Sequence, residues 1–185
     1  MSDRTYLTFL AHHVPDNKIS VFAEIFGPCL VNENPDDWDP VEIRPLSDAG
    51  APNSEPVEHS FASALRRGVT EFHVEEAPCG TVESADFSAL AEAVPDAVWE
   101  FWEDPKYEWL GSWIGYHPGC GLVGPLECDS HGDQQVSYQE AEARINASTQ
   151  ARPDALQLPP DRLLAVVFPQ RAFRLLVRQT LAGGD

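Results

Sequence analysis

Two pairs of possible metal ligands stand close together in the second half of the chain. His117 and Cys120 are separated by two residues, as are Cys128 and His131, and a glycine follows each pair. Imidazole nitrogens and thiolates are ligands of zinc, and a tight turn lets two ligands three positions apart point into one concavity. The spacing predicts a structural Zn²⁺ site, because four protein ligands leave no open position for catalysis.

The first pair also resembles a known metal-binding turn. The segment HPGCG is similar to the zinc-ribbon knuckle CPxCG, with His117 in the place of the first cysteine. The resemblance covers residues 117–131 alone and implies a local zinc-binding turn, not a fold for the whole chain.

An overlapping segment suggests a calcium site instead. DSHGDQQVSYQE resembles an EF-hand loop, with Asp129, Asp133 and Glu140 at its first, fifth and twelfth positions. The match departs where His131 takes the place of an oxygen ligand and Gln134 replaces the glycine of the sharp turn. We favour Zn²⁺ over Ca²⁺, and at most one of the two ions can use His131.

An aromatic segment follows the middle of the chain. VWEFWEDPKYEWLGSWIGY holds four of the five tryptophans. On a strand, Tyr107, Trp109 and Trp113 share a face with Gly115, and Trp102 would face Tyr107 or Trp109 across the turn. We expect a hairpin of the core. The alternative is a stacking platform beside carboxylates, as in a small-ligand or carbohydrate-binding protein or a hydrolase.

The elements that position these residues follow from hydrophobic periodicity. Alternation predicts strands over 6–13, 41–46, 70–75, 97–102, 107–116 and 122–128, and a period of 3.6 predicts helices over 61–67, 84–93, 137–145 and 169–183. This order favours an α+β fold: a mainly antiparallel sheet with helices packed on one face, an aromatic-rich hairpin at 97–116 and a C-terminal amphipathic helix. We expect one domain over 1–185, with a proline-rich connection at 150–160 to a C-terminal segment, 161–183.

One segment, residues 19–26, fits both periods. Ile19, Val21 and Ile25 alternate as in a strand, whereas Asp16 could cap a helix over the same residues. We favour the strand, paired in a hairpin with 6–13, because the segment is short and partly β-branched.

Acidic residues dominate the composition. The 185 residues carry a formal net charge of −18, and residues 1–143 hold 27 acidic and 6 basic side chains. Residues 144–185 hold 3 acidic and 6 basic side chains. Such a charge repels nucleic acid and anionic lipid and favours a basic protein partner. An acidic loop with Asp36, Asp37 and Asp39 is a candidate for that contact.

These observations favour a non-enzymatic function. The sequence contains no G-x-S-x-G, H-E-x-x-H or phosphate-binding glycine motif, and no nucleophile–base pair can be assembled from it. We therefore expect an acidic interaction protein that binds and inhibits a basic partner, as immunity proteins and nucleic-acid mimics do. A cytoplasmic location is expected, because the first residues lack the layout of a signal peptide. The predicted binding residues are Trp109, Trp113, Tyr107, Asp36, Asp37 and Asp39.

Overall fold

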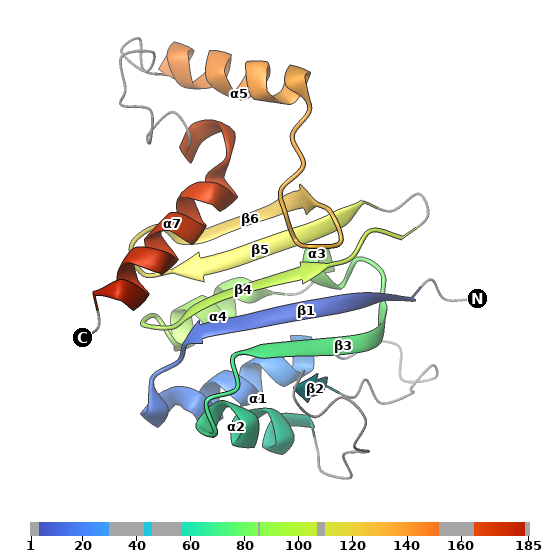
Figure 1. Ribbon diagram of the computed structural model, residues 1–185, viewed down its shortest axis with the longest axis vertical. Helices are drawn as coiled ribbons and strands as arrows, with labels where there is room; N and C mark the ends of the chain where they lie inside the picture. Colours follow the sequence, from blue (N-terminus) through green and yellow to red (C-terminus); the bar gives the residue numbers. More distant parts are fainter. Residues whose placement is uncertain are drawn as a thin grey trace.

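The fold is built on one antiparallel sheet. The computed structural model describes residues 4–29, 43–45, 57–84, 86–106, 110–151 and 165–183. Its strands are β1 (Arg4–His13), β2 (Ile43–Pro45), β3 (Glu71–Pro78), β4 (Val98–Glu103), β5 (Gly111–His117) and β6 (Gly121–Cys128). They lie in the order β2-β3-β1-β4-β5-β6, with β2 as a three-residue strand beside five longer ones (Figure 1). The predicted α+β fold with an antiparallel sheet is confirmed.

Helices lie on both faces of this sheet. They are η1 (Asp16–Lys18), α1 (Ile19–Cys29), α2 (Val57–Arg66), α3 (Thr81–Ser84), α4 (Phe87–Ala93), α5 (Tyr138–Ala151) and α7 (Pro169–Ala182). Figure 1 shows α4 behind the sheet, α1 and α2 at its lower end, α7 crossing β5 and β6 in front, and α5 set apart from the sheet. The sequence predicted helices on one face of the sheet; α1, α2 and α4 share one core there, and α7 adds a partial cover on the other face. No helix in the described ranges is long and apolar enough to cross a membrane.

The larger core lies between the sheet and α1, α2 and α4. Aromatic rings fill it: Phe9 of β1 lies 5.7 Å from Phe61 of α2, and Phe61 lies 4.6 Å from Phe72 of β3, measured between ring centroids. Phe87 of α4 packs against Trp99 of β4 in the same layer. Tilted rings at these separations are a favoured arrangement and add to the stabilisation from burial.

A smaller core lies under α7. It contains Val98, Trp102, Trp113, Cys128, Phe173 and Val177. Because helices cover both sides of the central strands, every residue of β4 and β5 is buried, including two glutamates of β4. The predicted hairpin of β4 and β5 exists, but Trp102 pairs with Trp113, not with Tyr107 or Trp109.

The expected strand over residues 19–26 is wrong, because the segment is the helix α1. Both edges of β1 are already paired, one with β3 and one with β4, so no position remains for a further strand. Ile19, Phe22 and Ala23 follow helical spacing and are buried against the sheet. The spacing of these three residues was the correct signal, and the alternation of the β-branched residues was misleading.

Several helix boundaries follow the sequence signals. Gly68 closes α2 with φ at +81°, a conformation that favours glycine. The hydroxyl of Ser137 accepts the backbone N–H of Glu140 at 3.2 Å and caps the start of α5. Pro169 occupies the first turn of α7, where its missing N–H costs nothing.

Candidate functional site

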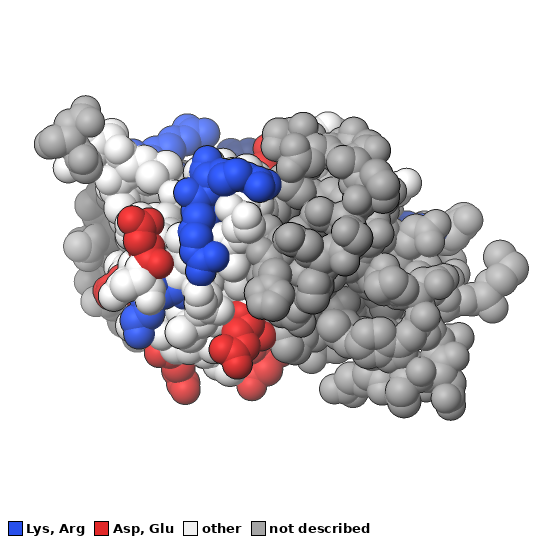
Figure 2. Space-filling model, turned by 90° about the horizontal axis from the view of Figure 1, so that it is seen from below, with Lys and Arg blue, Asp and Glu red and all other residues white. Residues whose placement is uncertain are grey.

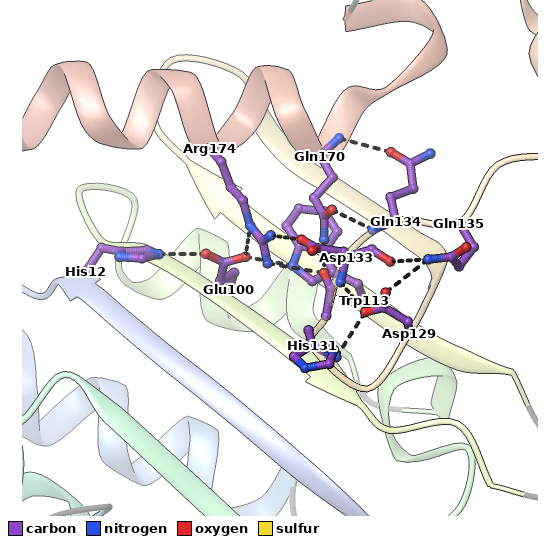
Figure 3. Close-up of polar contacts among 11 residues, drawn as sticks. His12, Glu100, Trp113, Asp129, His131, Asp133, Gln134, Gln135, Gln170 and Arg174 are labelled. Atoms are coloured by element: carbon purple, nitrogen blue, oxygen red, sulfur yellow. Dashed lines mark hydrogen bonds and ion pairs between the residues drawn. The ribbon is translucent and has the colours of Figure 1, made fainter.

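A buried glutamate lies at the centre of the polar network under α7. Glu100 of β4 is 2% exposed, and both of its carboxylate oxygens have partners. Oε1 lies 2.9 Å from Nε2 of His12 on β1. Oε2 accepts the indole N–H of Trp113 at 2.8 Å and Nε of Arg174 at 2.9 Å (Figure 3). Residues from β1, β4, β5 and α7 therefore meet at one carboxylate.

The charge state of Glu100 follows from these partners. Burial alone would raise its pKa, but the hydrogen bond with His12 and the positive charge of Arg174 outweigh burial and lower the pKa. The carboxylate is therefore ionised at neutral pH. Since its oxygens already accept three hydrogen bonds, it holds α7 against the sheet and is poorly placed to take a proton from a substrate.

Arg174 connects the same helix to the loop after β6. Its Nη1 donates to Asp133 Oδ1 at 2.6 Å, and its Nη2 donates to the carbonyl of Gly132 at 3.1 Å. Gln170, one turn earlier on α7, donates to the carbonyl of Gly132 and accepts the backbone N–H of Gln134 at 2.8 Å. The first two turns of α7 therefore fix residues 132–134 (Figure 3).

Asp129 shapes this loop from within. Its Oδ1 accepts the backbone N–H groups of His131 at 2.9 Å and Asp133 at 3.0 Å, and its Oδ2 accepts the side-chain amide of Gln135 at 3.1 Å. The loop packs Gly132 flat against Trp102, where a Cβ atom would lie only 2.6 Å from the indole ring. Glycine is required there for space, and its φ of +67° favours glycine as well.

The four predicted zinc ligands are not brought together. His117 pairs with Gly121 at one end of the β5–β6 hairpin, and Cys128 pairs with Gly111 at the other. At about 3.3 Å per residue, the strand separates the two ligand pairs by roughly 20 Å. Within the ranges that the structure covers, no group of three His, Cys, Asp or Glu side chains could hold a metal ion.

Three of these four residues, His117, Cys120 and Cys128, form other side-chain hydrogen bonds. The Nδ1 of His117 accepts the backbone N–H of Gly119 at 2.9 Å, so the proton is on Nε2, which donates to Thr180 Oγ1 at 2.9 Å. Cys128 is 2% exposed, and burial together with nearby carboxylates raises the pKa of its thiol to about 12. A thiol that is buried and protonated at neutral pH packs as an apolar group of the core and is a weak nucleophile.

The residues of the calcium hypothesis are also separated by their contacts. Asp129 binds amides of its own loop, Asp133 pairs with Arg174, and Glu140 pairs with Arg144 one turn along α5. Their oxygens satisfy local donors and two arginines, so they do not converge on a central position as an EF-hand requires.

The predicted binding residues have different outcomes. Trp113 is 0% exposed and packs edge-on against Phe173 of α7, with ring centroids 5.3 Å apart. The space beside Gly115 is filled by the same two rings, so it leaves no room for a ligand. Outside the described residues lie Tyr107, Trp109, Asp36, Asp37 and Asp39.

A second buried carboxylate lies three residues along β4, on the opposite face of the sheet. Glu103 is 3% exposed and accepts the backbone N–H groups of Gly80 at 2.6 Å and Val82 at 3.3 Å, at the start of α3. Burial, aided by the charge of Glu83, raises its pKa despite these hydrogen bonds. Glu103 fixes α3 to the sheet, as Glu100 fixes α7.

Sequence reasoning missed the network around Glu100. The available signal was a glutamate flanked by aromatic residues in VWEFWE, but the same pattern is typical of the solvated side of an amphipathic strand. In a strand covered on both faces, such a glutamate is buried and needs charged partners.

The chain matches no protein-family model, no curated protein and no solved structure.

Proposed function

We propose that this protein is a non-enzymatic acidic protein that binds and inhibits a basic protein partner. One observation carries the proposal: residues 68–105, which form β3, α3, α4 and β4, contain ten acidic residues and no lysine or arginine. An anionic field of this kind speeds encounter with a cationic surface and repels nucleic acid. A partner whose basic surface binds an anionic substrate would be inhibited when that surface is covered.

The carboxylates available to a partner lie on α3, α4 and the turns beside them. Glu83, Asp86, Glu92 and Asp96 are all exposed. None of the four forms an ion pair with another residue in the described part of the chain. Among the described residues no cation neutralises their charge, unlike that of Glu100.

Charge on another face is mixed. Figure 2 shows the molecule from below, the side on which Figure 1 places α1 and α2, with basic side chains beside acidic ones among the described residues. A basic partner would meet repulsion as well as attraction there. This difference favours the α3–α4 side over the α1–α2 side as the contact surface.

The buried polar residues support binding over catalysis. The oxygens of Glu100, the ring nitrogens of His117 and the backbone amides around Glu103 are used in contacts that join elements of the fold. The stacking role proposed for the aromatic hairpin loses Trp113, which is in the core.

The test is capture of a partner by the intact chain, followed by kinetics. Immobilised wild type and the variant E83K/E92K/D96K are exposed to host lysate at low salt, and bound proteins are identified and purified. We expect wild type to retain a protein of high isoelectric point and the variant to lose it. The association rate of the purified pair should fall steeply as salt rises.

The control variant is E127K/E142K, which makes the same kind of change at two exposed glutamates on β6 and α5. It should retain the partner. An association rate that does not change with ionic strength, or a captured partner without excess positive charge, would contradict the proposal.

A further inference from the structure

We propose that the outer face of α7 is a docking surface for the acidic α3–α4 side of a second copy of this chain. α7 contains three arginines and no acidic residue. Arg174 reaches inward to Glu100, whereas its neighbours Arg171 and Arg178, one turn before and one turn after it, are exposed. The helix is thus a basic element on an acidic protein.

The outer face of α7 combines charge with an apolar group. Arg171, Leu175 and Arg178 follow the spacing i, i+4, i+7 and form one stripe along the helix. Leu175 is 43% exposed between the two arginines. Arg171 lies over the ring of Phe168 at 4.9 Å, and within the described residues neither Arg171 nor Arg178 forms an ion pair. These two cations and the leucine fit an acidic surface.

The acidic counterpart lies on the other side of the same molecule. Figure 1 shows α7 in front of the sheet and α4 behind it, so the arginine stripe cannot reach Glu92 or Asp96 of its own chain. A second copy can supply them. The contact joins two different surfaces, so repetition would produce a closed ring or an open chain of copies.

The net charge of −18 opposes association of two copies, but distance limits this repulsion. The screening length is about 8 Å at physiological salt, which exceeds an ion-pair distance and is much shorter than a protein diameter. Local pairs of arginine and carboxylate therefore act while most of the net repulsion is screened. In about 1 M salt the screening length falls to about 3 Å, and the pairs weaken too.

The experiment is sedimentation velocity on the full chain at a series of concentrations, without any partner. In physiological salt we expect the mass of wild type to rise above that of one 20.4 kDa chain as concentration rises, and to return to it in high salt. The variants R171E/R178E and E92K/D96K should each remain monomeric, and an equimolar mixture of the two should associate again. R171K/R178K, which keeps the charges, should behave as wild type.

Each result decides the matter. The proposal is overturned if wild type stays monomeric at every concentration, or if R171E/R178E associates like wild type. It is also overturned if the mixture of variants stays monomeric although each variant keeps the circular-dichroism spectrum of wild type. This inference does not depend on the proposed basic partner, because the sedimentation experiment contains this chain alone. It predicts that a basic partner, which would use the same α3–α4 carboxylates, competes with self-association.

Discussion

Arg174 and Glu100 lie 74 residues apart in the chain, and their side chains meet at 2.9 Å between Nε and Oε2 under α7. The carboxylate is 3% exposed and the arginine side chain 26% exposed. The pair joins the helix to the middle of the sheet, and through Asp133 the same arginine joins both to the loop after β6. Contacts that link three elements make this pair the most informative target for mutation.

The variant R174A removes the cation and leaves Glu100 charged in the core. We expect a loss of about 3 kcal/mol in the free energy of unfolding, measured by urea denaturation, because breaking a buried pair costs about 3–5 kcal/mol and Arg174 is partly exposed. The control is R178A, an exposed arginine of the same helix, which should change stability by less than about 0.5 kcal/mol. Equal effects of the two variants would contradict the assigned role of Arg174.

The lowered pKa of Glu100 predicts a dependence of stability on pH. The stabilisation from a carboxylate with a lowered folded-state pKa is present above its ordinary pKa of 4.5 and is lost as pH falls further through the folded-state pKa. The difference in unfolding free energy between wild type and E100Q should therefore be largest near neutral pH and shrink in acid. Urea titrations between about pH 3 and pH 7 test this, and a difference that stays constant over this range would contradict the assigned environment of Glu100.

Glu103 should behave in the opposite way. Its folded-state pKa is raised, so folding favours the protonated form and the stabilisation is present below the ordinary pKa of 4.5. It is lost as pH rises through the folded-state value. The stability of wild type relative to E103Q should fall with increasing pH above the ordinary pKa of 4.5, whereas that of wild type relative to E100Q should rise with pH below 4.5. If the stability differences for E100Q and E103Q changed with pH in the same direction, the environments assigned to Glu100 and Glu103 would be wrong.

The close approach of α7 to β5 predicts coupling between Gly115 and Phe173. A Cβ at Gly115 would lie 2.9 Å from the Phe173 ring, so G115A should cost about 1–3 kcal/mol through overpacking. F173A should cost about 3–5 kcal/mol through lost burial and the cavity left behind. The double variant should cost less than the sum of the two, because the cavity left by Phe173 lets the Trp113 ring, 2.8 Å from the same position, move away from the added methyl group. Additive costs in urea denaturation would contradict the contact.

The separation of the predicted zinc ligands predicts insensitivity to chelation. Because the pairs at 117–120 and 128–131 lie at opposite ends of the β5–β6 hairpin, we expect EDTA to leave the Tm unchanged. C120S should also have the Tm of wild type, since Cys120 is exposed. A Tm that falls on chelation and is restored by added zinc would show that the two pairs come together.

The sequence predicted the fold better than the site, for a physical reason. Strand alternation and helical periodicity are local, and they correctly predicted β1, β3, β6 and the starts of α5 and α7. Residues 19–26 satisfied both periods, and the pairing of both edges of β1 decided between them. The predicted partner of Trp102, Tyr107 or Trp109, was wrong, because the sheet pairs Trp102 with Trp113.

Spacing along the chain was a poor guide to the metal-ligand hypothesis. The same seven residues that separate Cys120 from Cys128 form most of β6, and an extended strand moves its two ends apart. The partners of Glu100 lie 88 and 74 residues away in sequence, at His12 and Arg174, so no local pattern could indicate them. Only the order of the strands and the position of α7 bring these groups together.

The position of α7 has a consequence for synthesis on the ribosome. The helix that covers Trp102 and Trp113 follows the sheet in chain order, so these rings remain exposed to solvent after β4, β5 and β6 have been synthesised. Until Phe173 and Val177 emerge from the exit tunnel, the nascent chain exposes an apolar indole surface. The carboxylate of Glu100 beside it lacks its partner Arg174 during that time. We expect chaperones that recognise aromatic segments to engage the chain in that interval.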